Sequence, residues 1–533
     1  MTTNGGANGL VPAVADGLLG PYAADDFDIV TGATAPTRIT PSALFYFRDE
    51  CIAVPRQGIP AAGYTRRTRT LDDVVGWSRD VRLDAPGDRA ALILLGAPLR
   101  TDTAQLSPDA RTVTLSGTTH PFALAPRLAL NRSWFDASSA AFLSARPLRL
   151  RASQSGATVV GRTFWPADFR VGDDTPFAPL APDLPPALAL RSAMRADPSG
   201  GAQLPFAARV IWERDGGTRE WKDKPVLAVI VNGAQGDDDE AWAGHFAIGT
   251  GRMGAGGAID DLLVDNFYAL DIESEKGILA APVPLDNYFG DLNRGQSWYR
   301  PSFILIAALR DEAVPRLVQG AFNRVYQQFW RHQLEYRHST MNCAGISVDV
   351  LRALGWNLGA RRPAQALRAW LAIPYTLLRE RSLGKARMAF EYLTQDATRL
   401  FPAAAFEEAG AGLLRLGARG ATPGDGRLAT LLAQDLEALV LLRVPQFPSS
   451  RSFGAAPVVA PDEYRGVVPS NPADMQIVPV PPRPFPRELR DPDTLPPPRN
   501  PSDLPVAIWL AVTALVAVIA IAAACALAVA LVA

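Results

Sequence analysis

The sequence predicts an α+β fold in which a small, mostly antiparallel sheet and a cysteine-bearing helix form the central domain. A β-rich domain precedes it, and helices followed by one C-terminal transmembrane helix come after it. Three observations predict this order. Short β-like runs separated by turn residues fill residues 35–200. Longer apolar runs then lead to an amphipathic helix that begins at Cys343. An uncharged apolar segment ends the chain.

Length and composition narrow the class of protein. The 533 residues exceed one ordinary domain, and length alone suggests about three or four. The formal charge of −1 and the lack of a basic stripe with interleaved aromatic residues predict no nucleic-acid partner. Three widely spaced cysteines argue against a disulfide framework and against a CxxC metal site. We therefore expect neither a metal nor a cofactor.

The N-terminal part of the chain is predicted to contain two regions. Residues 1–30 are rich in glycine, alanine and aspartate and are predicted to be disordered. Residues 31–200 are predicted to form a β-rich accessory domain, with its clearest strands at Ala91–Leu95, Arg111–Leu115 and Leu148–Ala152. The sequence indicates no function for this domain.

Residues 201–360 are predicted to form the central domain, and the proline- and alanine-rich segment Pro182–Pro205 marks its boundary. Unbroken apolar runs indicate strands that are buried on both faces. These strands are predicted at Arg209–Glu213, Val226–Val231, His245–Gly249, Val264–Leu270 and Phe303–Leu309. An amphipathic helix is predicted over about Glu312–Glu335, and the Cys343 helix follows it.

The C-terminal third is predicted to end in a membrane anchor. Residues 361–443 are predicted to be helical, and residues 444–505 to be a proline-rich linker without a core. Val506–Ala533 carries no charge. At about 1.5 Å per residue it reaches roughly 40 Å, more than the ~30 Å hydrocarbon layer. This segment is predicted to be a transmembrane helix and the part of the chain that contacts a membrane.

The flanks of this segment predict its orientation. Arg487, Arg490 and Arg499 precede it and no residue follows it. The first residues of the chain lack the basic region and apolar core of a signal peptide. Because cytoplasmic flanks carry the positive charge, we expect a single-pass, tail-anchored protein with the bulk of its chain in the cytoplasm.

Cys343 is the residue with the clearest chemical signal. Ser339, Thr340 and Asn342 offer capping oxygens just upstream, so the thiol is expected at the N-terminus of a helix. The unpaired N–H groups and the macrodipole at that position favour the thiolate, which is the nucleophilic form.

A nucleophilic cysteine needs a base, and the chain has four histidines. His245 begins a predicted strand in the same domain, and we interpret His245 and Cys343 as a base–nucleophile pair. His338, five residues before Cys343, is a rival base. His332 falls on a predicted helix and is expected to be structural.

Two short motifs carry a resemblance to a known family. GHFAIGTG at 244–251 and NCAGISVDVLRALGW at 342–356 resemble the circularly permuted branch of the NlpC-type papain-like cysteine hydrolases, which includes the lecithin–retinol acyltransferase-like proteins. The resemblance implies a permuted papain-like domain over residues 201–360. It also implies hydrolysis of an amide, ester or thioester through a covalent cysteine thioester, with a peptide, amide or lipid substrate. Ala344, Gly345 and Ile346 differ from the residues that follow the cysteine in the acyltransferases.

Further site residues are expected near this pair. If the strand at His245 and the strand at Val264–Leu270 form a hairpin, Asn266 or Asp265 lies opposite His245 and orients its ring. The backbone N–H of Cys343, together with the side chain of Tyr336 or Asn342, is expected to bind the oxyanion.

Three alternatives remain open from the sequence. The chain is a lipid-directed acyltransferase or phospholipase of the same fold, or a non-catalytic scaffold tethered to a membrane. In the third alternative Gly249, Gly251 and Gly254 form a GxGxxG fingerprint, with Asp271 about twenty residues further on, and bind a dinucleotide.

Overall fold

The structure is a computed structural model of the chain. It describes residues 9–14, 17–34, 39, 41–57, 70–83, 89–128, 133–195, 204–217, 219–234, 243–270, 277–361, 366–450, 457–459 and 463. The predicted transmembrane helix Val506–Ala533 and most of the predicted linker lie outside these residues.

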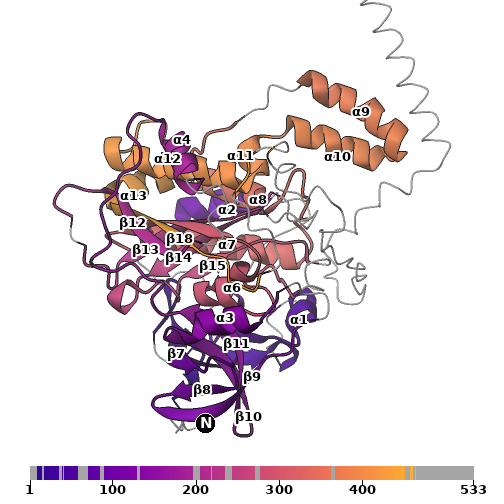
Figure 1. Cartoon of the computed structure of the whole chain (residues 1–533). Coiled ribbons are helices and arrows are strands. Elements are labelled where there is room, and N and C mark those ends of the chain that lie inside the picture. Colours follow the sequence, from indigo (N-terminus) through magenta and orange to yellow (C-terminus); the bar gives the residue numbers. More distant parts are fainter. Residues whose placement is uncertain are drawn as a thin grey trace, which may run out of the picture.

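A sheet of seven strands forms the centre of the described part of the chain (Figure 1). Every neighbouring pair in it is antiparallel. In spatial order the strands are β12 (Ala207–Glu213), β18 (Leu436–Val444), β17 (Ser302–Leu309), β13 (Pro225–Asn232), β14 (His245–Arg252), β15 (Leu263–Asp265) and β16 (Val283–Pro284). All residues of β13 and β17 are buried, which explains their unbroken apolar sequences.

Strand β18 corrects the prediction that residues 361–443 are helical. Its sequence, LEALVLLRV, is apolar enough for a buried helix or a buried strand, and tertiary pairing decides between them. It pairs with β17 on one side and with β12 on the other. Strand β18 therefore lies between β12 and β17 in the sheet, although it follows both of them by more than 120 residues in the sequence.

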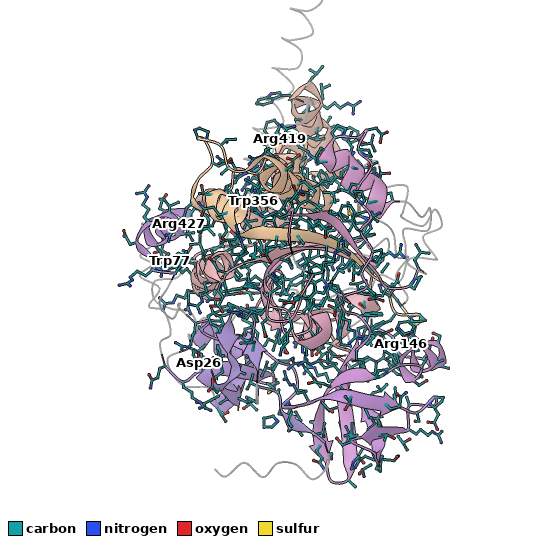
Figure 2. The ribbon with its side chains drawn as sticks, turned by 90° about the vertical axis from the view of Figure 1, so that its left-hand side faces the viewer. Asp26, Trp77, Arg146, Trp356, Arg419 and Arg427 are labelled. Atoms are coloured by element: carbon teal, nitrogen blue, oxygen red, sulfur yellow. The ribbon has the colours of Figure 1, made fainter. Side chains whose placement is uncertain are left out.

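Helices pack against this sheet and against each other. They are α7 (Ala313–Trp330), α8 (Cys343–Ala353), α12 (Pro402–Arg419), α13 (Arg427–Asp435), α2 (Thr70–Asp80) and α4 (Pro186–Met194). Helix α8 contacts β14, α12 contacts β13 and β14, and α2 contacts both α7 and α8. Figure 2 shows Trp77 and Arg427 on the same side of the molecule, where Arg427 donates a hydrogen bond to the carbonyl of Val81 at 3.1 Å.

The N-terminal residues extend this core rather than standing apart from it. Strands β4 (Phe27–Thr31), β5 (Cys51–Pro55) and β6 (Ile93–Leu94) form a three-stranded sheet, and α1 (Pro41–Phe47) packs Phe47 against Trp330 of α7. The hydrophobic core is thus continuous across the predicted boundary near residue 200.

The predicted disorder of residues 1–30 is wrong for residues 9–14 and 17–30. Short strands lie at β1 (Val11–Pro12), β2 (Leu18–Leu19) and β3 (Tyr22–Ala23). Leu19, Tyr22 and Phe27 are buried in a cluster that includes Leu263 of β15. Glycine and alanine made the segment look unstructured, but these three large side chains supply enough apolar surface to fix it.

A second sheet lies beside the first at the lower end of Figure 1. Its strands, in spatial order, are β1, β7 (Leu99–Leu106), β10 (Leu148–Ser155), β11 (Thr158–Pro166), β9 (Thr118–Leu124) and β8 (Thr112–Leu115), with α3 (Ala137–Ser144) packed on β7. Helix α6 (Leu285–Gly290) contacts β11, and Arg151 of β10 forms a fully buried ion pair with Asp286 at 2.6 Å. Buried charge therefore joins the two sheets.

Two helices project from the body of the molecule: α9 (Ala366–Glu380) and α10 (Leu383–Thr394), shown at the upper right of Figure 1. They pack against each other. Helix α11 (Ala397–Leu400) then leads back to α12. The first residues after β18, which were predicted to begin a linker, are fixed: Phe447 is buried against Trp298, with 4.5 Å between ring centroids.

The described residues form a mixed α+β structure with several sheets, but the predicted arrangement of domains around a small sheet is wrong. The central sheet has seven strands, one of its inner strands, β18, comes from the region predicted to be helical, and the N-terminal residues share its core. Among the described residues, no helix combines the length and the apolarity that crossing a bilayer requires.

Candidate functional site

The helix that carries Cys343 begins as the sequence indicates. Asn342 caps α8, and its side-chain oxygen accepts a hydrogen bond from the N–H of Gly345 at 2.9 Å. Its amide nitrogen donates to the carbonyls of His338 at 3.1 Å and Leu400 at 2.9 Å. Because its amide is fully engaged with backbone groups, Asn342 fixes the start of the helix and is not the expected oxyanion donor.

Cys343 is buried and surrounded by hydrogen-bond donors. Burial raises the pKa of its thiol, and the backbone N–H groups of Phe246 and Ala344, the hydroxyl of Tyr336 and the charge of Arg300 act in the opposite direction. The expectation of a depressed pKa is thus wrong in its net sign, since desolvation outweighs the helix terminus. The resting cysteine is a neutral thiol whose ionised form is already provided with donors.

His245 lies at the first position of β14 and is also buried. Its ring stacks on Tyr268, with 4.2 Å between centroids and 7° between planes, and lies 6.3 Å from the ring of Tyr288. Burial, followed by the positive charge of Arg300, lowers the pKa of His245 well below its ordinary value. The imidazole is therefore neutral at pH 7 and able to accept a proton.

The structure brings Cys343 and His245 to the same end of β14. The N–H that reaches the sulfur belongs to Phe246, so the sulfur lies against the peptide unit that joins His245 to Phe246. Tyr288 neighbours both groups: its ring faces His245, and the charge of Cys343 raises the pKa of its hydroxyl together with burial, the larger cause. Within the described residues, Nε2 of His245 is buried and has no hydrogen-bond partner. The thiol–imidazole hydrogen bond is thus not formed at Nε2, and this nitrogen is left open.

Tyr336 lies where an oxyanion donor is needed. Its hydroxyl accepts a hydrogen bond from the backbone N–H of Cys343 at 3.4 Å and also lies within hydrogen-bonding reach of the sulfur. The N–H of Cys343 and the hydroxyl of Tyr336, which were expected to act together, are therefore adjacent. His338, the rival base, packs edge-on against the ring of Tyr336 with 5.2 Å between centroids.

The expected third group is not in place. Strand β15 ends at Asp265, which pairs with Ile248 rather than with His245. Asp265 accepts a hydrogen bond from Gln319 at 2.9 Å, and Asn266 donates to the carbonyl of Ala281 at 2.8 Å. The hydrogen bonds that these two side chains make go to residues other than His245, and Oδ2 of Asp265 is buried without a partner among the described residues. The predicted strand Val264–Leu270 was too long, and this error shifted the predicted partner.

Tyr268 takes the position opposite His245. Continuing the observed β14–β15 register past its last pair puts residue 268 across from residue 245, and the two rings are stacked there. The hydroxyl of Tyr268 accepts a hydrogen bond from Gln296 at 2.8 Å, and Gln296 in turn accepts one from Arg300 at 3.0 Å. A buried polar chain therefore supports the imidazole through its stacking partner.

The sequence carries a signal for the residues that support His245. Tyr288, Gln296 and Arg300 belong to the polar, aromatic segment between β16 and β17, and all three are buried. Polar residues in such numbers between buried strands indicate a buried site, since each polar atom must find a partner there. Residue type alone did not reveal which strand end they would reach.

The glycine-rich alternative fails on geometry. Gly249 and Gly251 lie within β14, and Gly254 precedes a short 3₁₀ turn, η3 (Ala255–Gly257), in which Gly256 has φ of 63°. No helix N-terminus follows the strand at the place where a dinucleotide fingerprint requires one to hold the pyrophosphate. The described residues also contain no cluster of three or more His, Cys, Asp or Glu side chains that could hold a metal ion.

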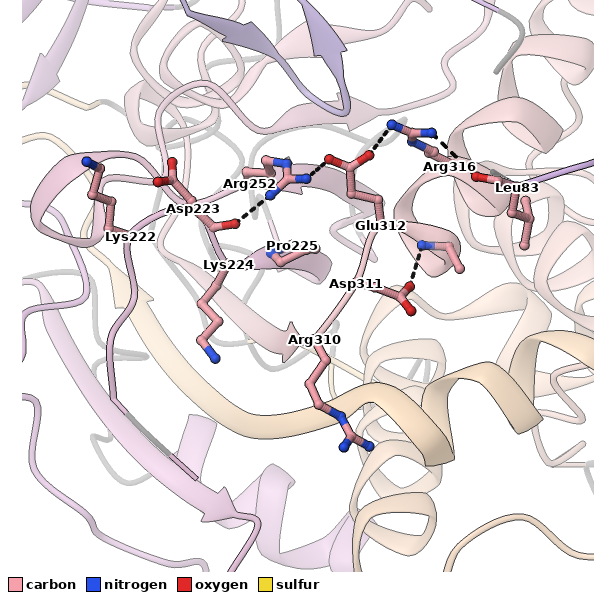
Figure 3. Close-up of a pocket in the computed structure, with 11 residues that line it drawn as sticks. Leu83, Lys222, Asp223, Lys224, Pro225, Arg252, Arg310, Asp311, Glu312 and Arg316 are labelled. Carbon is pink, nitrogen blue, oxygen red and sulfur yellow. Dashed lines mark hydrogen bonds and ion pairs between the residues drawn. The ribbon is translucent and has the colours of Figure 1, made fainter. Parts of the chain in front are cut away.

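A cavity of about 550 Å³ lies at the other end of β14, around Arg252 (Figure 3). Three of its charged side chains are mutually paired, because Glu312 forms ion pairs with both Arg252 and Arg316. Arg252 also donates to the carbonyl of Asp223 at 2.8 Å. These residues stand seven positions along the strand from His245, so the cavity is separate from the thiol.

Comparisons with protein-family models, with curated proteins and with solved structures gave no match.

Proposed function

We propose that the chain is a thiol hydrolase that cleaves an amide, ester or thioester through a covalent thioester on Cys343. His245 is the general base, and Tyr336 with the backbone N–H of Cys343 binds the oxyanion. Tyr268 is a positioning residue that holds the imidazole ring by stacking.

The proposal rests on one observation above the others. The sulfur of Cys343 accepts a hydrogen bond from the backbone N–H of Phe246, the residue that follows His245, so the proposed nucleophile lies against the backbone next to the proposed base. A buried imidazole nitrogen without a partner requires an explanation, because a buried polar atom left unpaired is costly. A proton-accepting role beside a thiol supplies that explanation.

The protonation states define the first step. Since the pKa of Cys343 is raised and that of His245 is lowered, the resting pair is thiol and neutral imidazole. His245 takes the thiol proton as the sulfur attacks the carbonyl carbon, and the carbonyl oxygen becomes an oxyanion. The intermediate collapses to a thioester, and the imidazolium returns its proton to the leaving amine, alcohol or thiol.

The second half-reaction restores the enzyme. Water attacks the thioester carbonyl while His245 removes its proton, and the carboxylic acid leaves as the sulfur regains a proton. The same two donors stabilise both oxyanions. They are fixed before the reaction, which is what makes oxyanion stabilisation effective.

Acylation by p-nitrophenyl acetate tests this proposal without knowledge of the natural substrate. We expect a burst of nitrophenolate, with the acetyl group found by peptide mass spectrometry on Cys343 and not on Cys51. His245→Ala slows this acylation by at least about a hundredfold, since a general base typically contributes 10²–10⁴. The Cys51→Ala variant is the matched control and keeps the burst.

Two results would count against the proposal. Acetyl groups spread evenly over Cys51, Cys343 and surface lysines would indicate a non-catalytic scaffold. Equal acetylation of Cys343 in the wild-type and His245→Ala chains would show that the imidazole takes no part.

A further inference from the structure

The most exposed apolar surface of the described chain lies on α9. We define the apolar stripe as Leu367, Trp370, Leu371, Tyr375 and Leu378, whose side chains are 75%, 64%, 61%, 61% and 69% exposed. Their spacing of three, one, four and three residues places them on one side of the helix. Apolar residues scattered singly on a surface need no explanation, but a continuous stripe marks a contact surface.

The stripe faces away from the hairpin's own interior. The residues that α9 and α10 bury are small or few: Ala369, Leu377 and Ala386. Trp370 touches Phe390 of α10 at a centroid distance of 5.0 Å with one edge and leaves most of its surface open. The usual amphipathic pattern is therefore inverted, with the larger apolar side chains on the solvent side.

Charge indicates what covers the stripe. Residues 366–394 contain five basic side chains against two acidic ones, in a chain whose formal charge is −1. On a helical wheel Arg368 and Arg379 follow the edge of the stripe, and both are exposed. Two copies of so basic a hairpin would repel each other, whereas an anionic surface would attract it.

We propose that the apolar stripe and its basic border dock on an anionic lipid surface, with α9 lying in the plane of the interface. Leucine side chains enter the acyl boundary, Trp370 and Tyr375 lie at headgroup depth, and the arginines meet lipid phosphates. This is a peripheral contact and is independent of the proposed chemistry at Cys343.

The hairpin is anchored so that docking fixes the body of the protein. Glu391 near the end of α10 accepts a hydrogen bond from Ser339 at 2.7 Å. Asp396, which caps α11, forms an ion pair with Arg352 of α8 at 3.0 Å. The hairpin is therefore held to Ser339, which precedes the Cys343 helix, and to Arg352 within that helix.

Hydrogen exchange of the full chain with vesicles tests the proposal, because it reports on residues 366–380 separately from every other segment. With phosphatidylglycerol vesicles we expect exchange of these amides to slow by roughly tenfold or more, since each buried leucine alone favours the bound state to that degree. With phosphatidylcholine vesicles the slowing is smaller, and raised salt weakens it further.

Matched variants separate the stripe from its background. The triple variant Trp370→Gln, Leu371→Gln, Leu378→Gln loses the protection, and Arg368→Gln with Arg379→Gln reduces it. Leu188→Gln on α4, where the leucine is 43% exposed, retains it. Unchanged exchange in β13 and β17 shows that each variant is folded.

Two outcomes would overturn the proposal. Exchange of residues 366–380 that is indifferent to both vesicles would exclude a lipid surface. Protection that appears without vesicles as protein concentration rises, together with a dimer in sedimentation that the triple variant abolishes, would make a second copy the occupant.

Discussion

Cys343 is buried and Cys51 is partly buried, and their surroundings differ in what they offer a negative charge. Burial raises the pKa of Cys51 to about 12, and the neighbouring carboxylate of Glu50 adds to the rise. Burial also raises the pKa of Cys343, but two backbone N–H groups and the hydroxyl of Tyr336 point at its sulfur and oppose the rise. The backbone N–H that reaches the Cys343 sulfur belongs to Phe246, the residue after His245.

The difference shows that burial alone does not set the electrostatic surroundings of a thiol. Arg151, Arg162 and Arg294 lower the pKa of Cys51, but the carboxylate of Glu50 has a larger effect than any one of them, and these arginines form ion pairs with buried carboxylates. At Cys343 the donors are two backbone N–H groups and the hydroxyl of Tyr336, and the charge of Arg300 acts in the same direction. Fixed dipoles without a competing anion are the arrangement that stabilises a thiolate as it forms.

The largest expected effect on turnover comes from removing the hydroxyl of Tyr336, which lies beside Cys343 and has no counterpart among the groups that act on Cys51. Tyr336→Phe keeps the ring but deletes the donor that is near both the sulfur and the Cys343 N–H. Loss of one oxyanion donor lowers turnover about 10²–10³-fold, and we expect this for hydrolysis of p-nitrophenyl acetate by the variant. Steady-state rates and acetylation of Cys343 measure it.

Tyr375→Phe is the control for this change. It also removes a hydroxyl, one that accepts a hydrogen bond from Arg379 at 2.9 Å on the exposed side of α9. Its turnover should match the wild-type value. A rate for Tyr336→Phe within about threefold of the wild type, when one donor is worth far more, would remove Tyr336 from the oxyanion site.

A smaller effect is expected from the helix cap. Asn342→Ala removes the oxygen that accepts the Gly345 N–H and the amide that donates to two carbonyls. Loss of a cap costs about 1 kcal/mol of the free energy of unfolding, which urea titration measures. Since the cap also fixes the start of α8, acetylation of Cys343 slows by less than in Tyr336→Phe.

Ser382→Ala provides the comparison for the cap. Ser382 caps α10 in the same way and accepts the N–H of Lys385 at 3.2 Å. Ser382→Ala should lower the free energy of unfolding by a similar amount and leave the rate of Cys343 acetylation unchanged. Equal slowing of Cys343 acetylation in both variants would mean that the Asn342 effect is not local to the thiol.

The parts of the site that depend on local sequence were predictable. The Cys343 helix start and its Asn342 cap follow from local preferences, and the structure has both. Tyr336 was a candidate because it lies close in sequence. His245 could be placed at the start of a strand from its apolar run alone, and β14 begins there.

Residues set by register could not be predicted in the same way. The partner of His245 depends on where β15 ends, and a strand end depends on pairing rather than on residue type. The run of residues 264–270 was predicted to be one strand, but β15 ends at Asp265. For this reason the residue opposite His245 was predicted to be Asn266 or Asp265, whereas it is Tyr268. Strand β18 was missed for the same reason, because its place between β12 and β17 is decided by distant segments.

The smallest expected effect on Cys343 comes from Asp265→Asn, which separates stability from chemistry. Burial raises the pKa of Asp265 well above its ordinary value, so the folded carboxyl is protonated at mildly acidic pH. A raised folded pKa contributes stability that is fully present below the unfolded pKa of about 3.9 and is lost as pH rises through the folded value. The variant should therefore equal the wild type near pH 4 and exceed it in free energy of unfolding near pH 7.

Asp425→Asn gives the opposite sign and serves as the control. Hydrogen bonds from Arg415 and Thr422 lower the pKa of Asp425 to about 2. Its contribution is fully present above the unfolded pKa of about 3.9 and is lost as pH falls through the folded value of about 2, so its removal lowers stability at pH 7. If the register argument is right, neither variant changes the ratio of Cys343 to Cys51 acetylation. A marked fall in that ratio for Asp265→Asn alone would restore Asp265 as the group that orients His245.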